Sequence, residues 1–215
     1  MIKSHYMFLD TEASGEPVRW DVSSVDGSDW PYLVQISWVI YTLDGNEIKR
    51  EKLYIDEQDF KSTSSALKIH KITDRFRQQN GFSRQEVLNR LLFDLQKYDP
   101  LLICHFLKFD LNLLKVELRR AKIDYDLNQI PAFCTMLATK YLAGTPHARP
   151  LHLSQLYAVL FYKSLQNYHD ALCDTLATAE CFFELFKSGY ITEKTILDQI
   201  KERKIGYDHI KVVSK

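Results

Sequence analysis

Two carboxylates stand at the end of a short apolar segment near the start of the chain. Residues 6–9 read YMFL, and Asp10 and Glu12 follow, separated by Thr11. Side chains alternate between the two faces of a strand, so Asp10 and Glu12 are predicted to share one face. Two acids at a partly desolvated strand end repel each other, and a bound cation relieves that repulsion. For this pair taken alone, a strand end with solvated acids or a helix cap is the simpler interpretation.

Two further acids lie at the starts of predicted helices. Asp110 lies in LLICHFLKFDLNLL, where a buried strand is expected to lead into a helix. Asp174 follows His169 in NYHDALCD. Asp170 is a typical N-cap residue, which places Asp174 in the first turn of a helix and His169 in the preceding loop. A loop histidine before a capped helix is more often structural than catalytic, so this segment also has a structural interpretation.

Together these residues offer four carboxylates and one histidine. Two divalent cations neutralise four negative charges, and Mg²⁺ and Mn²⁺ prefer oxygen ligands of this kind. Two such ions, about 4 Å apart, can clamp the attacking and leaving oxygens of an in-line phosphoryl displacement, which is nuclease chemistry. His169, whose ordinary pKa lies close to neutral pH, is the candidate general base for the attacking water.

The elements that must position these residues are those of a mixed α/β domain. Strands are predicted over 4–10, 32–43 and 47–55, and the Asp44-Gly45 pair between the last two is a strong hairpin signal. A helix is predicted over 84–98 and a buried strand after Pro100. Further helices are predicted from 108, near 134–142, 152–161, 171–187 and 193–204. This order predicts an antiparallel three-strand meander joined to parallel strands and flanked by helices, and not a doubly wound nucleotide fold.

The composition indicates a compact protein without a dominant charge. Among 215 residues, 28 basic residues balance 28 acidic ones, so a polyanionic partner must be held locally. The four cysteines lack CxxC spacing and are predicted to be reduced structural thiols. No segment approaches the roughly 20 apolar residues of a membrane span, and a cytoplasmic location without membrane association is expected.

We expect one domain over 1–190, with 191–215 as a C-terminal helix and tail packed on it or extending from it.

Three segments resemble the signature motifs of a known enzyme family. FLDTEASG, HFLKFD and HDALCD are similar, in order and spacing, to the motifs of the DEDDh 3′-to-5′ exonucleases, a DnaQ-like group that includes RNase T and the DNA polymerase III epsilon subunit. The resemblance spans residues 6–187 and implies a ribonuclease H-like mixed sheet. It assigns metal-ligand positions to Asp10, Glu12, Asp110 and Asp174, and the general-base position to His169. It also implies two divalent ions, Mg²⁺ or Mn²⁺.

The resemblance further implies a substrate groove beside the acids. The candidate groove residues are Thr11, Ala13, Ser14, His70, Phe106, Trp20 and Trp30. Two positions depart from the family pattern, because Phe106 replaces an asparagine and Lys71 replaces a glycine, so the substrate contacts are expected to differ. The rings of Trp20 and Trp30 either stack on terminal bases, worth roughly 1 to 3 kcal/mol each, or pack their loop onto the domain.

The leading hypothesis is a metal-dependent 3′-to-5′ exonuclease that releases nucleoside 5′-monophosphates from DNA or RNA. The alternative is a non-catalytic or weakly active module with the same fold that binds 3′ ends, and the presence of all five residues favours the enzyme. The balanced charge predicts few phosphate contacts and therefore short, single-stranded substrates. The choice between DNA and RNA stays open, as does a polymerase or other protein partner.

Overall fold

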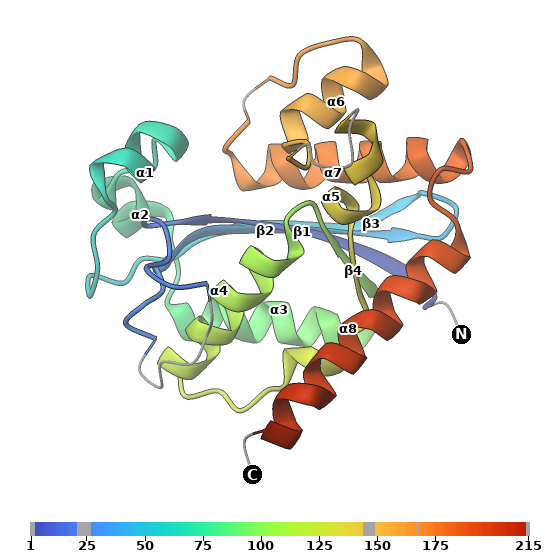
Figure 1. Cartoon of the computed structure of the whole chain (residues 1–215). Helices are drawn as coiled ribbons and strands as arrows, with labels where there is room; N and C mark the ends of the chain where they lie inside the picture. Colours follow the sequence, from blue (N-terminus) through green and yellow to red (C-terminus); the bar gives the residue numbers. More distant parts are fainter. Residues whose placement is uncertain (1–2, 21–26, 144–148, 167, 214–215) are drawn as a thin grey trace.

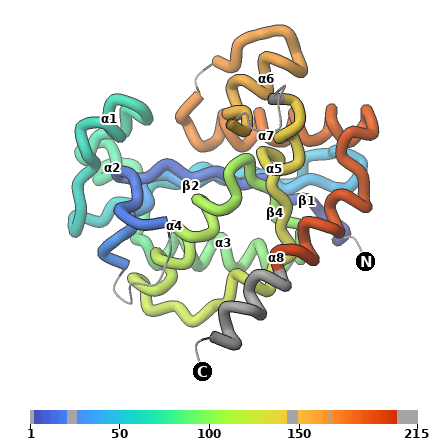
Figure 2. The backbone as a smooth tube through the Cα atoms, in the orientation of Figure 1, coloured from blue at the N-terminus to red at the C-terminus, as the bar shows by residue number. Residues whose placement is uncertain are grey.

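A five-stranded sheet forms the middle layer of the molecule, and helices cover both of its faces (Figures 1 and 2). The computed structural model describes residues 3–20, 27–143, 149–166 and 168–213, with the side chains of the last helix described as far as Arg203. The strands are β1 (His5–Ala13), β2 (Leu33–Thr42), β3 (Glu47–Tyr54), β4 (Leu101–Cys104) and β5 (Ala132–Cys134).

The sheet has the strand order β3-β2-β1-β4-β5. β1, β2 and β3 pair antiparallel, whereas β4 pairs parallel to β1 and β5 parallel to β4. The predicted meander joined to parallel strands is therefore confirmed. Gly45 forms the β2–β3 hairpin with a φ of 82°, a left-handed conformation that glycine adopts without strain. Its amide donates to the carbonyl of Thr42 at 3.1 Å.

Two hydrophobic cores lie on opposite faces of the sheet. Met7 and Leu9 of β1 pack in the core beneath α3 (Arg84–Tyr98) and α4 (Leu107–Arg120). Tyr6 and Phe8, which alternate with them, pack in the core beneath α6 (Leu153–Phe161) and α7 (Ala171–Lys187). Because both faces of β1 are covered, its sequence is apolar from Tyr6 to Leu9, directly before Asp10.

The C-terminal helix α8 (Glu193–Val213) runs beside the edge strand β5 (Figure 1). The side chain of Gln199 accepts from the Cys134 amide at 3.0 Å and donates to the Cys134 carbonyl at 3.2 Å. Arg203 also donates to the carbonyl of Ile130. The helix therefore satisfies backbone groups that an edge strand otherwise leaves to solvent.

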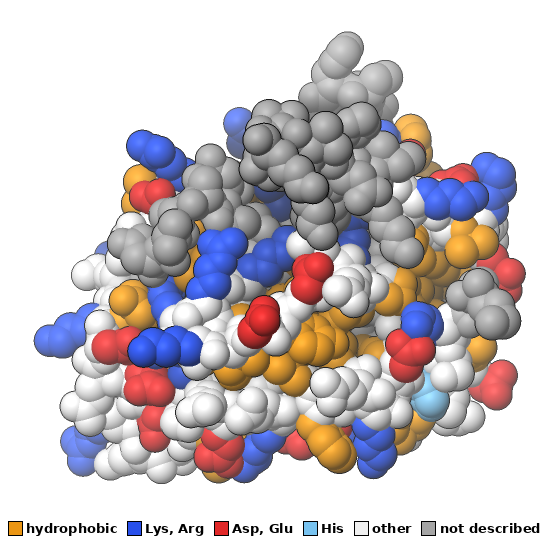
Figure 3. Space-filling view, turned by 90° about the horizontal axis from the view of Figure 1, so that it is seen from below, with side chains coloured by type: hydrophobic (Ala, Val, Ile, Leu, Met, Phe, Trp, Pro, Cys, Tyr) orange, Lys and Arg blue, Asp and Glu red, His pale blue; other side chains and the backbone are white. Residues whose placement is uncertain are grey.

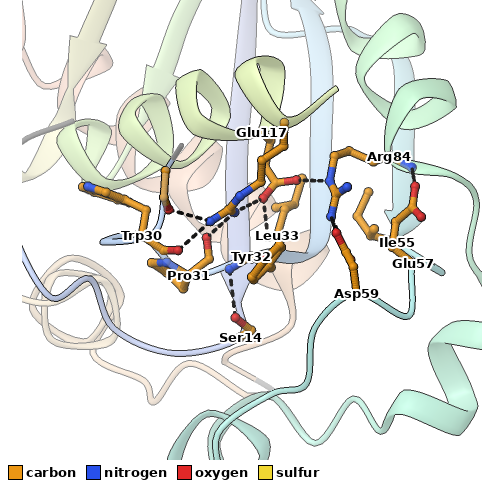
Figure 4. A network of polar contacts seen from close by, with 12 residues as sticks. Ser14, Trp30, Pro31, Tyr32, Leu33, Ile55, Glu57, Asp59, Arg84 and Glu117 are labelled. Atoms are coloured by element: carbon orange, nitrogen blue, oxygen red, sulfur yellow. Dashed lines mark hydrogen bonds and ion pairs between the residues drawn. The ribbon is translucent and has the colours of Figure 1, made fainter. Parts of the chain in front are cut away.

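A buried ionic network joins α4 to α3 and to the chain before β2; we call it the Glu117 network (Figure 4). Glu117 is fully buried and accepts from Arg84 Nε at 2.6 Å and from Arg120 Nη1 at 2.5 Å. The Leu33 amide donates to the same carboxylate at 3.2 Å. Arg120 also donates to the carbonyls of Gly27, Trp30 and Pro31. The network therefore fixes the segment 27–33 against α4.

The remaining segments depart in part from the sequence prediction. Two short helices, α1 (Ser64–His70) and α2 (Asp74–Asn80), were not predicted. The helix expected over 134–142 is instead α5 (Thr135–Ala138) followed by a 3-10 turn over Lys140–Ala143. A further 3-10 turn spans Leu127–Gln129, and α8 extends beyond residue 204.

The charge pattern of the surface and the state of the cysteines agree with what the composition predicts. Acidic and basic side chains alternate over the underside of the molecule in Figure 3, so this face has no field of one sign. The four cysteines, Cys104, Cys134, Cys173 and Cys181, are all free thiols. Within the described part of the chain, no helix combines the length and apolar character needed to cross a bilayer.

Candidate active site

The end of β1 carries the first two acids on one face, as predicted. Asp10 is half-buried and Glu12 is buried, and the strand pairing becomes irregular between Glu12 and Ala13. Thr11 points to the opposite face, where its hydroxyl donates to Asp110 Oδ1 at 2.7 Å. One face of β1 therefore carries Asp10 and Glu12, and Thr11 on the opposite face holds the carboxylate of Asp110.

Asp110 enters the site from the first turn of α4. Its side chain is only 2% exposed. Phe106 is the N-cap of this helix and gives no side-chain cap, so the first-turn carboxylate lies near amides that have no helical acceptor. The helix start and the Thr11 hydroxyl together hold Asp110 at the sheet.

Asp174 and His169 come from the start of α7, which covers the other face. Asp170 caps this helix by accepting from the amides of Leu172 and Cys173, which confirms the predicted cap. The His169 amide donates to Asp174 Oδ2 at 2.9 Å, and His169 adopts a left-handed φ of 68°. This hydrogen bond holds the backbone of His169, which precedes the helix, against Asp174 in its first turn.

Glu12, His169 and Asp174 converge closely enough to hold one cation. One ligand atom from each lies within 4.8 Å of the others. Asp174 Oδ1 is buried and has no hydrogen-bond partner among the described residues, which is costly for a carboxylate unless a cation or water completes it. Two carboxylates and an imidazole are a donor set that suits Mn²⁺, Mg²⁺ or Zn²⁺. The residues present therefore fit a divalent ion.

A clamp of three side chains holds the start of α7 against β2 and β3. Lys52 Nζ lies 2.6 Å from Asp170 Oδ2, and Gln35 Nε2 donates to the same oxygen at 3.3 Å. The Gln35 carbonyl oxygen accepts from the Ala171 amide at 3.0 Å. Gln35 is also the cross-strand partner of Glu12. Gln35 therefore lies beside Glu12 in the sheet and also holds the start of α7, which follows His169 directly.

The carboxyl groups of the site share one electrostatic environment. Burial, followed by repulsion from Asp110, Asp174 and Glu12, raises the pKa of Asp10 well above its ordinary value. Burial and the charge of Asp174 raise the pKa of Glu12 to about 8. Burial raises the pKa of Asp110 to about 7 and that of Asp174 to about 6, against the hydrogen bonds from Thr11 and from the His169 amide. A site that holds acids in such mutual repulsion is suited to divalent cations.

The stability of the metal-free protein should fall between pH 6.5 and 8.5. A carboxyl group with a raised folded-state pKa binds its proton more tightly when folded, so stability is lost as pH rises through that pKa. The folded-state pKa values of Glu12 and Asp110, about 8 and about 7, lie in this interval, where the same carboxyl groups of the unfolded chain are already ionised. We expect a loss of about 2 kcal/mol, or a Tm lower by about 4 to 8 °C, measured by calorimetry in EDTA.

Two controls separate this effect from a general alkaline destabilisation. Glu12→Gln removes one of the titrating groups and should flatten the fall. Mn²⁺ should raise the Tm more at pH 8 than at pH 5.5, because it competes with protons for the carboxylates. A Tm that is independent of both pH and Mn²⁺ across this interval would contradict the electrostatic description.

The candidate groove residues are distributed unevenly around the site. Thr11, Ala13 and Ser14 are buried, and the Ser14 hydroxyl accepts from the Tyr32 amide at 2.8 Å. The backbone of Ser14 is also occupied, because its amide donates to the Tyr32 carbonyl at 2.8 Å and its carbonyl accepts from the Thr63 amide at 2.7 Å. His70 is also buried; its Nδ1 accepts from the Ile72 amide at 2.9 Å, and its Nε2 finds no hydrogen-bond partner within the described ranges.

The aromatic candidates separate into buried and exposed rings. Trp30 is only 2% exposed and packs against Trp20 and Phe109, so for this ring the loop-packing alternative describes the structure. Trp20 and Phe106 remain 46% and 40% exposed. The stretch 21–26 of the expected loop lies outside the described residues.

The clamp residues Gln35 and Lys52 were missed by the sequence prediction. Gln35 had a signal, because it is a polar side chain inside the apolar run YLVQISWV and is completely buried. A buried amide in a central strand must have hydrogen-bond partners, which points to a structural or functional contact. Lys52 had no such signal, since it is one of several charged residues on the edge strand β3.

Comparisons with known proteins agree with this geometry. A family model described as exonuclease, of the RNase T type, matches residues 8–182. No curated protein matches the chain. Among solved structures, exonuclease I aligns with a TM-score of 0.70 at 18% identity, over 92% of this chain and 43% of the other.

Two further solved structures show the same relation. The zinc-bound complex of E. coli exonuclease I with single-stranded DNA aligns with a TM-score of 0.68 at 16% identity, over 92% of this chain and 42% of the other. A moderately thermophilic exonuclease I from Methylocaldum szegediense aligns with a TM-score of 0.65 at 20% identity, over 84% and 40%. The chain therefore shares its mixed-sheet fold with these proteins and spans less than half of their length.

Proposed function

This chain belongs to the RNase T family of exonucleases, and from that premise we propose that it is a metal-dependent 3′-to-5′ exonuclease releasing nucleoside 5′-monophosphates. The observation that carries the proposal is the convergence of Glu12, His169 and Asp174 within 4.8 Å, with one oxygen of Asp174 buried and unpartnered in the part of the chain that the structure describes. Asp10 and Asp110 extend the same carboxylate cluster, because the charges of Asp110, Asp174 and Glu12 all contribute to the raised pKa of Asp10.

The four carboxylates would hold two divalent ions, Mg²⁺ or Mn²⁺. Such ions, when bound, polarise the scissile phosphate and stabilise the negative charge that develops on the leaving 3′ oxygen. Asp10 and Glu12 contribute from one strand face, and Asp174 from the helix that covers it. Asp110, hydrogen-bonded to Thr11, contributes from the opposite side.

His169 is the group that would accept a proton. Its side chain is exposed, while its backbone is fixed by the hydrogen bond to Asp174. Partial burial, together with the charge of His152, lowers the pKa of His169, so the imidazole is neutral and able to act as a base at pH 7. As the water oxygen bonds to phosphorus, its proton passes to a ring nitrogen and the bond to the 3′ oxygen breaks.

The proposed substrate is a single-stranded nucleic acid with a free 3′ end. The balanced net charge supports this, because it offers few long-range contacts for a duplex. The similar E. coli exonuclease I is solved with single-stranded DNA. We place the protein in the cytoplasm, which agrees with its four free thiols.

The decisive experiment uses 5′-labelled oligonucleotides of DNA and RNA, single-stranded, duplex and with mismatched 3′ ends. With Mn²⁺ or Mg²⁺ the labelled strand should shorten stepwise from the 3′ end, and EDTA should stop the reaction. His169→Ala should lower kcat by about 10²- to 10⁴-fold, whereas His5→Ala, at the other end of β1, should leave it unchanged. A folded, Mn²⁺-binding protein that shortens none of these substrates would instead be a non-catalytic binding module.

A further inference from the structure

The first turn of α7 is tied to the sheet by contacts that a helix cap does not require. Asp170 Oδ1 accepts from the amides of Leu172 and Cys173 at 3.2 and 3.3 Å, which completes the cap. Its second oxygen, Oδ2, accepts from Lys52 at 2.6 Å and from Gln35 at 3.3 Å. One oxygen of Asp170 therefore serves the helix, and the other is held by the clamp residues of β2 and β3.

Gln35 uses both ends of its side-chain amide at this point. The side chain is completely buried in β2. Its oxygen accepts from the Ala171 amide at 3.0 Å, and its nitrogen donates to Asp170. The Ala171 amide is one of the first amides of the helix, which have no acceptor within it. Because Gln35 pairs across the sheet with Glu12, the same residue of β2 lies beside a proposed metal ligand and contacts the start of α7.

Lys52 adds an ion pair from the edge strand β3. The side chains of Lys52 and Asp170 remain 33% and 30% exposed. Ion pairs with this degree of exposure contribute little to the free energy of unfolding, because water screens the charges. The pair nevertheless restricts where Asp170 can lie, since one carboxylate oxygen is shared between Lys52 and Gln35. A positional effect of Lys52 can therefore be measured without a large loss of stability.

His169 directly precedes Asp170, and its own backbone is constrained. Its φ of 68° is a left-handed conformation that a residue with a β-carbon adopts at a cost. Its amide donates to Asp174 Oδ2 at 2.9 Å. The imidazole is exposed and contacts the ring of Tyr168, with centroids 4.8 Å apart. The imidazole is thus not enclosed by the core, and its position depends on the backbone at 169–170.

We infer that Gln35 and Lys52 are positioning residues for the proposed general base. They hold Asp170, and through it the backbone of His169, in a fixed place relative to Glu12 on the neighbouring strand. The inference rests on the proposed function, since a base acts only when its imidazole lies within reach of the attacking water. A displacement of about 1 Å at a reacting group costs about 100-fold in rate, so a small movement of α7 has a measurable effect.

Steady-state kinetics on a 5′-labelled dT12 oligonucleotide with Mn²⁺ test the inference. Lys52→Met removes the charge and keeps a long side chain, so it should lower kcat by about 10- to 100-fold and change KM by less than about twofold. Lys52→Arg should retain most of the activity, because it restores the ion pair with Asp170. Gln35→Met should lower kcat further, since it also leaves the Ala171 amide without its acceptor.

Arg50→Met is the matched control. Arg50 lies two residues before Lys52 on the same face of β3, and its ion-pair partner Glu47 belongs to the same strand. The variant therefore removes a basic side chain and an ion pair from β3 without affecting the contacts to α7. Its kcat and KM should equal those of the wild type.

Hydrogen exchange in EDTA separates positioning from a general structural role. In Lys52→Met the amides of His169 and Ala171 should exchange at least about 10-fold faster, while the amides of β1 keep their wild-type rates. Faster exchange throughout the sheet, or an unchanged kcat in Lys52→Met, would overturn the inference. If the wild-type protein shortens no oligonucleotide, the proposed function fails instead, and the exchange rate of the His169 amide still shows whether the clamp holds it.

Discussion

Asp10→Asn should lower the nuclease rate by at least about 10³-fold and, at the same time, raise the Tm of the metal-free protein at pH 8. The activity is lost because an amide is a poor ligand for a hard divalent cation, and such cations contribute several kcal/mol to the transition state. The stability rises because the neighbouring acids and burial disfavour the charged form of Asp10, and asparagine removes that charge without changing the shape.

The size of the stability gain follows from the raised pKa of Asp10. A tenfold change in a proton-binding constant corresponds to about 1.4 kcal/mol, so a gain of at least that amount, or about 3 to 6 °C in Tm, is expected. Calorimetry in EDTA and the oligonucleotide assay measure the two effects on the same preparation. Asp44→Asn, in the exposed β2–β3 turn, is the matched control and should change neither. A variant that keeps its activity would remove Asp10 from the proposed metal site.

Glu117→Ala should destabilise the protein by about 3 to 5 kcal/mol, the largest effect on stability expected of a residue outside the proposed site. Glu117 accepts from Arg84 and Arg120 while it is fully buried, so its removal leaves the Arg120 guanidinium without this carboxylate and leaves Arg84 with Asp59 as its acidic partner. In a domain of this size such a loss lowers the Tm by roughly 6 to 20 °C.

Urea unfolding at pH 7 measures the effect of Glu117→Ala. Glu86→Ala is the matched control, because it breaks the exposed i,i+4 ion pair with Arg90 and should cost less than about 0.5 kcal/mol. A Glu117→Ala protein as stable as the wild type would show that the buried arginines find water or other acceptors.

The fold was largely predictable because its strongest patterns are local. The apolar run before Asp10, the Asp44-Gly45 turn and the helical spacing over 84–98 each depend on neighbouring residues, and α3 has the predicted bounds. The sequence analysis did not predict α1 and α2, because both helices are only seven residues long and lack an apolar stripe. Thr63 and Thr73 cap them, but a capping threonine alone is a weak signal.

For the candidate site, residue types were predictable and contacts were not. The spacing of His169, Asp170 and Asp174 indicated a loop, a cap and a first turn, and the structure has all three. The sequence did not show which tryptophan is buried, because Trp20 and Trp30 occur in similar polar surroundings. Both rings contact Phe109, and their exposed fractions of 46% and 2% differ only through the tertiary packing. The Lys52–Asp170 contact joins residues 118 positions apart, and no local pattern encodes it.

The hydrogen bond between Thr11 and Asp110 spans 99 residues, and Asp174 completes the cluster from still farther along the chain. During synthesis on the ribosome, the strand with the first acids and the helix with the third are made and can pair before α7 exists. The proposed cation site is therefore incomplete until α7 has been synthesised and has docked on the sheet.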